Sequence, residues 1–285
     1  MTSANTLTGA TAFNNPNLYD DMDVVFIQYP KNFILDAINS RQVSKVPANW
    51  KWKEQIAGGT GVPTVVLEAG TKPLVDYKFE WKYASRNKYA ARIEVTEEEE
   101  MDFEQLQLSI INMFERDVLT VYQDAVYAAI LTYATTYVSS ALDGKLVAPS
   151  IYSVIGALKL AVQAANYDPD IVIMNPGDAA EAIYLQTVDG MQQFIPADLQ
   201  FAGLRPFLSN KVTIGTVIVG TSATIQEQHG AFIIRKGVAD GQFITNESTI
   251  VGEIFSALKL PIASKASWAV GSVATLKGLL KVVQA

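Results

Sequence analysis

The chain has 285 residues, of which 49% are hydrophobic and 18% are charged, a composition typical of a globular protein and not of a disordered one. It contains no cysteine and one histidine, which excludes disulfide frameworks, cysteine nucleophiles and multi-histidine metal sites. The formal net charge is −7 without any lysine–arginine cluster, which argues against a protein that reads a nucleic-acid sequence through a basic face.

The N-terminal region predicts an extended, weakly ordered arm, which we assign to residues 1–44. Its first nineteen residues carry no charged side chain and are rich in Thr, Asn and Ala. A secretory signal would need a basic start and an apolar block, and neither is present. The longest apolar run of the chain, residues 125–131, is far too short for a membrane span. We therefore expect a soluble protein made in a cytoplasm.

The next segment predicts a short strand followed by a joint. Residues 45–56 hold Trp50 and Trp52 in an alternating pattern that suits a strand. The glycine-rich residues 57–61 resemble a phosphate-binding loop, but such a loop continues with Lys-Ser or Lys-Thr, whereas Val62-Pro63 follows here. We interpret residues 57–61 as a flexible joint.

Residues 62–94 predict a long hairpin, with strands at 64–67 and 77–83 and a tip at 70–73. In the returning strand, aromatic residues alternate with lysine and glutamate at a period of two. A two-stranded ribbon is rarely stable alone, so its aromatic face should need a partner surface in this chain or in a neighbouring one. The aromatic residues of this face are Tyr77, Phe79, Trp81 and Tyr83.

A helix start is predicted at Thr96, as N-cap, with Glu99 as its capping-box partner. The four glutamates at 97–100 suit the positive end of the helix dipole, and they would fan around a helix instead of converging on a metal ion. Apolar residues then recur at steps of three and four, which predicts one long amphipathic helix over 98–132. They are Phe103, Leu106, Ile110, Phe114, Val118, Val121, Tyr122, Ala125 and Ala129.

The second half of the chain mixes helices and strands without regular alternation, which favours an α+β fold. The only histidine, His229, lies in the polar segment 226–230, which we interpret as a solvated turn. A Ser-His-Asp triad would have to recruit this residue. The predicted elements are a helix at 151–165, a buried strand at 171–174, a turn at 175–178 that caps a helix at 179–187, strands within 212–234 and 243–260, and a mixed apolar segment at 269–283.

This order of elements resembles the tailed-bacteriophage major capsid proteins of the Hong Kong 97 type, whose fold also occurs in encapsulin shells. Four blocks carry the resemblance: 52–54 with 65–73, similar to the family's extended loop; 93–97 leading into the long helix; 171–178 with Asp189-Gly190 downstream; and 243–246 with Ile250 and Glu253. The match runs from about Trp50 to the C-terminus.

The resemblance implies the α+β phage major capsid fold. Its parts would be an N-terminal arm at 1–44, the first strand of a peripheral domain at 45–56, an extended β-hairpin loop at 57–93, the peripheral domain with a long spine helix at 94–147, an axial domain at 148–232, long peripheral strands at 233–268, and a return to the axial domain at 269–285.

The function that the resemblance implies is structural. The chain would assemble with itself, as pentamers and hexamers, into an icosahedral virion shell in the host bacterial cytoplasm, and would enclose double-stranded DNA without sequence-specific binding. We expect no enzyme activity, cofactor, metal or membrane contact. Many members of the family carry a charged helical scaffolding leader, whereas here Met1 opens directly onto the arm. The resemblance then implies a separate scaffolding protein or none, with a portal and a decoration protein as further partners. The candidate contacts between subunits are Lys72, Pro73, Tyr77, Phe79, Trp81 and Tyr83.

Some members of this family join their subunits by lysine–asparagine isopeptide bonds. By resemblance, Lys72 would be the donor, Asn246 the acceptor and Glu253 the glutamate that takes the proton. We expect non-covalent closure instead, because the pattern at Asn246 and Glu253 recurs in members without crosslinks.

Two alternatives remain at this stage. An encapsulin-like compartment would have the same fold with an enzyme as cargo, although the uncharged N-terminal segment lacks the charged helix with which encapsulins dock cargo. An acyl-enzyme could use Ser256 and Lys259, which have Ser-x-x-Lys spacing, but the companion motifs are missing and the segment is strand-like.

Overall fold

The computed structural model describes residues 34–56, 61, 63–66, 68, 70–96, 104–183, 201–238, 242 and 246–282. These residues fall into two compact units. Unit 1 takes its described residues from Tyr89–Thr120 and Phe232–Ile254, and unit 2 from Asn32–Lys88, Val121–Ala231 and Phe255–Ala285. The division falls within helix α3 (Glu104–Tyr133) and within strand β11 (Glu247–Lys259).

Unit 1 contains β11 up to Ile254, strand β10 (Ile233–Gly237), most of strand β4 (Asn87–Thr96) and the first half of α3. β10 runs antiparallel to β11, and β4 also pairs with β11. Gly252 of β11 lies against aromatic rings, because a Cβ at this position would come within 2.4 Å of Phe114 and 2.6 Å of Phe232. The missing side chain is therefore what lets both rings pack on the strand.

The main sheet of unit 2 has the strand order β5-β12-β8-β6-β7. β6 is parallel to β7 and antiparallel to β8, which is in turn antiparallel to β12. The strands are β5 (Thr135–Thr136), β6 (Ile171–Met174), β7 (Arg205–Leu208), β8 (Thr216–Gly220) and β12 (Trp268–Ser272), and the helices of this part are α4 (Ile151–Ala164), α5 (Pro176–Ile183) and α7 (Val273–Leu280).

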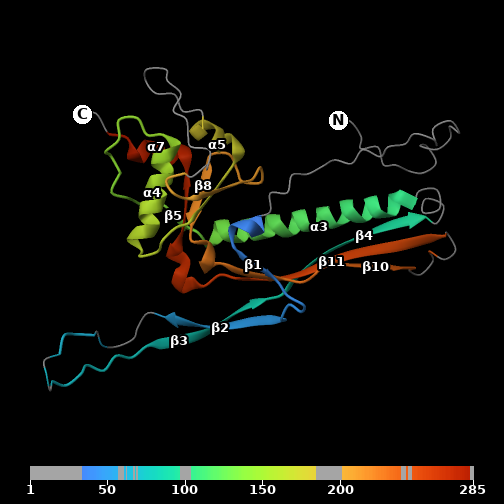
Figure 1. The fold of residues 1–285 in the computed structure, drawn as a ribbon, viewed down its shortest axis with the longest axis horizontal. Helices are drawn as coiled ribbons and strands as arrows, with labels where there is room; N and C mark the ends of the chain where they lie inside the picture. Colours follow the sequence, from blue (N-terminus) through green and yellow to red (C-terminus); the bar gives the residue numbers. More distant parts are fainter. Residues whose placement is uncertain are drawn as a thin grey trace. The chain divides into compact units, whose positions relative to one another are not determined.

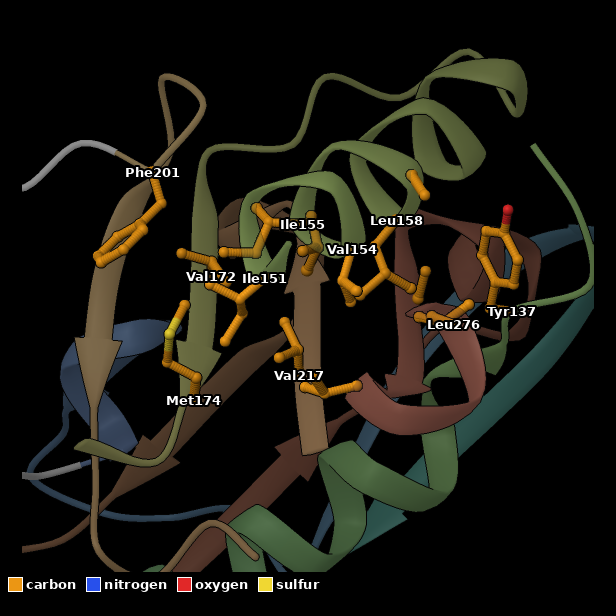
Figure 2. Close-up of a cluster of buried hydrophobic side chains, with 14 of the residues drawn as sticks. Tyr137, Ile151, Val154, Ile155, Leu158, Val172, Met174, Phe201, Val217 and Leu276 are labelled. Atoms are coloured by element: carbon orange, nitrogen blue, oxygen red, sulfur yellow. The ribbon is translucent and has the colours of Figure 1, made fainter. Parts of the chain in front are cut away.

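The core of unit 2 lies between α4 and this sheet (Figure 2). α4 turns one apolar stripe toward the strands, and β6 is buried along its whole length. Because neither element carries a polar side chain on these buried positions, apolar burial supplies the stability of this layer. The side chains labelled in Figure 2 include Ile151, Val154, Ile155 and Leu158 of α4 opposite Val172, Met174, Val217 and Leu276.

A second set of strands in unit 2 joins the start of the described chain to its later part (Figure 1). The 3-10 helix η1 (Ile34–Ala37) leads into β1 (Asn39–Gln42), which pairs in parallel with β9 (Gln226–His229). β9 then pairs antiparallel with residues 256–259 of β11. Residues 34–42, which we expected to belong to the arm, thus contribute a helical turn and a strand. Two further 3-10 turns are η2 (Ser222–Thr224) and η3 (Ile262–Ser267).

Several sequence predictions are confirmed. The long helix, the helix at 151–165 and the strand at 171–174 are present as α3, α4 and β6. α5 begins at Pro176 and not at residue 179, because Asn175 already caps it, accepting a hydrogen bond on Oδ1 from the Gly177 N–H at 2.8 Å. The predicted capping box at Thr96 and Glu99 depends on residues 97–103, which lie outside the described residues, as do 184–200 and 243–245. None of the helices in the described ranges combines the length and apolar composition that a bilayer crossing requires.

The expectation that His229 lies in a solvated turn is wrong, because this residue belongs to β9 and completes a buried polar cluster. Its neighbour Glu227 is only 1% exposed. The Glu227 carboxylate accepts hydrogen bonds from the Tyr122 hydroxyl on Oε1, and from Ser40 Oγ at 2.6 Å and His229 Nδ1 at 2.9 Å on Oε2. These donors come from α3, β1 and β9. Their hydrogen bonds offset the free-energy cost of burying the Glu227 carboxylate.

We predict that Tyr122 and Glu227 are energetically coupled. Glu227→Gln should lower the free energy of unfolding by about 1–3 kcal/mol, because a neutral amide replaces a charged acceptor in a buried site. Tyr122→Phe should cost about 1 kcal/mol, and the double variant should cost less than the sum of the two single variants. Denaturant unfolding of the four proteins measures the coupling. Strictly additive losses would contradict a shared hydrogen bond.

Candidate functional site

A hairpin is present, but only its second strand is the predicted one, because the first strand comes from the segment 45–56 that we had assigned to the peripheral domain. β2 (Asn49–Ile56) pairs antiparallel with β3 (Lys78–Ser85) over eight residues on each side, from Asn49↔Ser85 to Ile56↔Lys78 (Figure 1). Residues 63–66 form no strand, so the expected strand at 64–67 is wrong in its described part. The physical reason is complementarity: β2 and β3 both alternate aromatic and charged residues, whereas Pro63 removes a backbone donor from the other candidate.

The outer face of this hairpin, which we define by Phe79, Trp81 and Tyr83 of β3, is exposed. Their side chains are 60%, 62% and 69% exposed, and Tyr77 just before β3 is exposed as well. Opposite residues of an antiparallel pair share a face, which places Lys53 beside Trp81, and the Lys53 ammonium lies 5.1 Å from the indole centroid. Among the described residues, no segment covers this aromatic row.

Lys72 and Pro73 lie in the irregular connection between the two strands, and both are exposed, as predicted for a tip. Gly61, the one described residue of the predicted joint, has a φ of +87°. A Cβ at Gly61 would come within 2.0 Å of the Leu74 carbonyl oxygen, so the two sides of the connection touch here. Only glycine combines this backbone conformation with such a close approach.

The inner face of the hairpin holds Trp50, Trp52 and Glu54 of β2, and it is attached to the rest of unit 2. Glu54 is 5% exposed, and its Oε1 accepts a hydrogen bond from the Ala263 N–H of η3 while its Oε2 lies 3.4 Å from the donor Trp52 Nε1. The Lys259 ammonium lies 5.7 Å and 5.6 Å from the Trp50 and Trp52 ring centroids. The buried Glu54 carboxylate and the Lys259 ammonium, which lies near both indole rings, therefore attach the inner face to the rest of unit 2.

η3 is itself held by side chains from two other parts of unit 2. The Tyr133 hydroxyl donates to the Pro261 carbonyl at 2.6 Å, and the Tyr167 hydroxyl donates to the Ala263 carbonyl at 3.2 Å. The Tyr133 phenol, like any tyrosine, is protonated at neutral pH and can donate, and burial raises its pKa further above the usual value. The segment that receives Glu54 is thus fixed by α3 and by the turn after α4.

The three isopeptide candidates do not form one site within the chain. Asn246 is exposed just before β11, whereas Glu253 is buried within β11, where its Oε1 lies 3.3 Å from Arg235 Nη2. Seven residues of extended strand separate them, about 20 Å at the usual rise, far beyond the reach of a general base. Lys72 belongs to unit 2, and the other two candidates belong to unit 1.

The arrangements that could suggest an enzyme do not have catalytic geometry. Ser40 Oγ lies 3.3 Å from the same His229 nitrogen that faces Glu227, and the serine hydroxyl donates to the carboxylate. A triad instead places the imidazole between the two groups, with a different nitrogen toward each. Ser256 and Lys259 are three residues apart in β11, so their side chains point to opposite faces of the strand.

Sequence reasoning did not single out Glu54. A signal existed, because Glu54 shares its strand face with Trp50 and Trp52, and a charge in such a row is either exposed or paired. Its partner, the Ala263 N–H, lies more than two hundred residues away in the chain. Because this donor is a backbone group, the residue type at 263 does not predict the contact.

A protein-family model described as phage capsid protein matches residues 82–257, more than half of the chain. Comparison with curated proteins finds no match.

Solved structures share the fold. A chain from Microbacterium phage Oxtober96 is similar with a TM-score of 0.68 at 12% identity, covering 90% of this chain and 96% of the other. A chain from Mycobacterium phage Bobi is similar with a TM-score of 0.66 at 15% identity, with coverage of 90% and 95%. The capsid of a native GTA particle is similar with a TM-score of 0.67 at 10% identity, with coverage of 93% and 98%.

Proposed function

Because the chain belongs to the phage capsid protein family, we propose that it builds its shell in the manner of the Hong Kong 97 type, with the outer face of the hairpin as a contact between subunits. Membership of the family makes the chain a structural component of the virion, a subunit that assembles with copies of itself into the capsid shell and is not an enzyme. The order of the long helix α3, the α4–sheet layer and the long strand β11 supports the finer assignment to a spine helix, an axial domain and peripheral strands.

The observation that carries the proposed contact is the exposed aromatic row of β3. Burying the three rings Phe79, Trp81 and Tyr83 would remove roughly 300 Å² of apolar surface from water, worth about 7 kcal/mol before the costs of association. A row of this size on a two-stranded ribbon marks an interaction surface. Lys72 and Pro73, exposed on the connection, would extend the same contact.

The partner that we assign to this surface is a second copy of the chain. A closed shell repeats one subunit many times, so moderate contacts add cooperatively. The chain carries a net charge of −7, so the average surface of a neighbouring copy is acidic, whereas Lys51 and Lys53 lie on the outer face. Opposite charge at the edge of an apolar contact favours this pairing over random ones.

The shell would consist of pentamers and hexamers around double-stranded DNA. An acidic wall suits this role, because weak repulsion keeps a packaged polyanion from binding tightly to the container. A separate scaffolding protein, a portal and a decoration protein would complete the assembly. Electron microscopy of expressed particles tests this proposal, since DNA-sized shells are expected, and small compartments filled with enzyme would contradict it.

The outer face should be required for assembly and not for folding. Phe79→Ser combined with Trp81→Ser should leave the cooperative thermal melting of the subunit unchanged, while light scattering shows the loss of closed shells. The matched control, Phe79→Tyr combined with Tyr83→Phe, keeps three rings on the face and should assemble normally. A wild-type protein that stays a monodisperse 31 kDa species at high concentration, or normal shell yield from the serine variant, would contradict the proposed contact.

The subunits would close without covalent bonds. The Glu253 carboxylate, the proposed proton acceptor, is buried and paired with Arg235, and it lies too far along β11 to serve Asn246 of its own chain. An isopeptide bond would therefore need the lysine, the asparagine and the glutamate to be brought together from different subunits.

Mature particles boiled in denaturant should accordingly run as a single 31 kDa band on a gel. The comparison variant is Lys72→Ala, which should give the same band as the wild type. A ladder of multimers in the wild type that disappears in Lys72→Ala would show that covalent closure occurs.

A further inference from the structure

We propose that Glu54 is a positioning residue for the hairpin, because its hydrogen bond to the Ala263 N–H sets the direction in which β2 and β3 present the outer face. The inference rests on the proposed role of that face as a contact between subunits. It concerns a residue that does not belong to the contact itself, since Glu54 lies on the opposite side of the ribbon.

Of the two hydrogen bonds that the Glu54 carboxylate accepts, one leads out of the hairpin and one stays within it. Its register partner on β3 is Glu80, which is engaged by Lys82 at 2.7 Å. The donor to Oε1 comes from η3, outside the hairpin, and the donor to Oε2 is the neighbouring Trp52 indole. The buried carboxylate therefore links the ribbon to a separate element.

The other contacts of the inner face constrain direction much less. A lysine ammonium over an indole ring is held by a broad electrostatic attraction, and the contacts of Lys259 with Trp50 and Trp52 are of this kind. A hydrogen bond to a charged acceptor has a narrow range of distance and angle. Moving the hairpin so that this bond breaks would leave a buried carboxylate short of a donor, which is unfavourable.

The receiving side is rigid enough to define a direction. η3 is fixed at Pro261 and Ala263 by the hydroxyls of Tyr133 and Tyr167. At its other end, the Ser267 carbonyl accepts a hydrogen bond from the Thr221 N–H at 3.1 Å. These hydrogen bonds fix η3 relative to the main sheet of unit 2. The hydrogen bond from η3 to Glu54 then fixes the hairpin relative to η3.

A distance measurement between two spin labels tests the proposal. The chain has no cysteine, so Lys78→Cys on β3, which lies on the face opposite the outer face, and Gln163→Cys on α4 provide two exposed labelling sites. Pulsed electron-spin measurements would use labelled full-length subunits diluted with unlabelled protein. The expected result is a narrow distance distribution in the Glu54 protein and a broad one in Glu54→Ala, since losing a charged hydrogen bond shifts the equilibrium about tenfold or more toward the detached hairpin.

Two further variants make the test specific. Glu80→Ala removes the carboxylate directly opposite Glu54 and should leave the distribution narrow, because the salt bridge of Glu80 is to Lys82 of the hairpin itself. Glu54→Gln keeps an acceptor for the Ala263 N–H but loses the charge, so it should give an intermediate width. This variant decides the question if Glu54→Ala does not fold.

The outcomes separate the two proposals. Unchanged distributions in the folded Glu54 variants would overturn the positioning role. A broad distribution together with a loss of closed shells supports both proposals. A broad distribution with shells closing at the wild-type yield supports the positioning role and contradicts the outer face as an essential contact.

Discussion

A two-stranded ribbon has two faces, and the described residues of this chain cover only one of them. The pairing of β2 with β3 forces Trp50, Trp52 and Glu54 to one side and Phe79, Trp81 and Tyr83 to the other. The first face is attached to η3 and Lys259, so the second has no described part of its own chain against it. The period of two in the sequence therefore decides both how the hairpin is held and which of its faces stays exposed among the described residues.

Buried carboxylates provide direction where apolar packing provides stability. The layer formed by α4 and the main sheet of unit 2 is apolar, and its contacts depend mainly on shape and area. Glu54, Glu227 and Glu253 instead lie buried on strands. Glu54 accepts a hydrogen bond from η3, Glu227 accepts hydrogen bonds from α3 and β1, and Glu253 pairs with an arginine of β10. Each would be costly without its partner, so each fixes one particular arrangement of the elements it joins.

The sequence predicted the elements whose signal is local and strong. α3, α4 and β6 have clear periodicity, and the exposed aromatic row was placed on the correct strand. The pairing of β3 with residues 49–56 was missed, because the glycine-rich joint favoured a nearer partner at 64–67, whereas register depends on the whole alternating pattern of both strands. His229 was misplaced because its neighbours are polar. Tyr122 and Ser40 donate the hydrogen bonds that allow Glu227 to be buried in this polar strand. Both are far from Glu227 in the sequence, so no local pattern predicts these bonds.

The charge of the chain limits how strong any one contact between copies should be. Subunits with a net charge of −7 repel one another on average, so association needs local surfaces that reverse this balance. In the proposed contact, the outer face would do so by combining aromatic area with the exposed cations Lys51 and Lys53. Apolar area supplies the free energy of such a contact, and the cations favour an acidic partner surface. The direction in which this face points then decides whether the proposed contact can be repeated around a closed shell. We infer that this direction depends on the hydrogen bond between the Ala263 N–H and Glu54, on the opposite side of the ribbon.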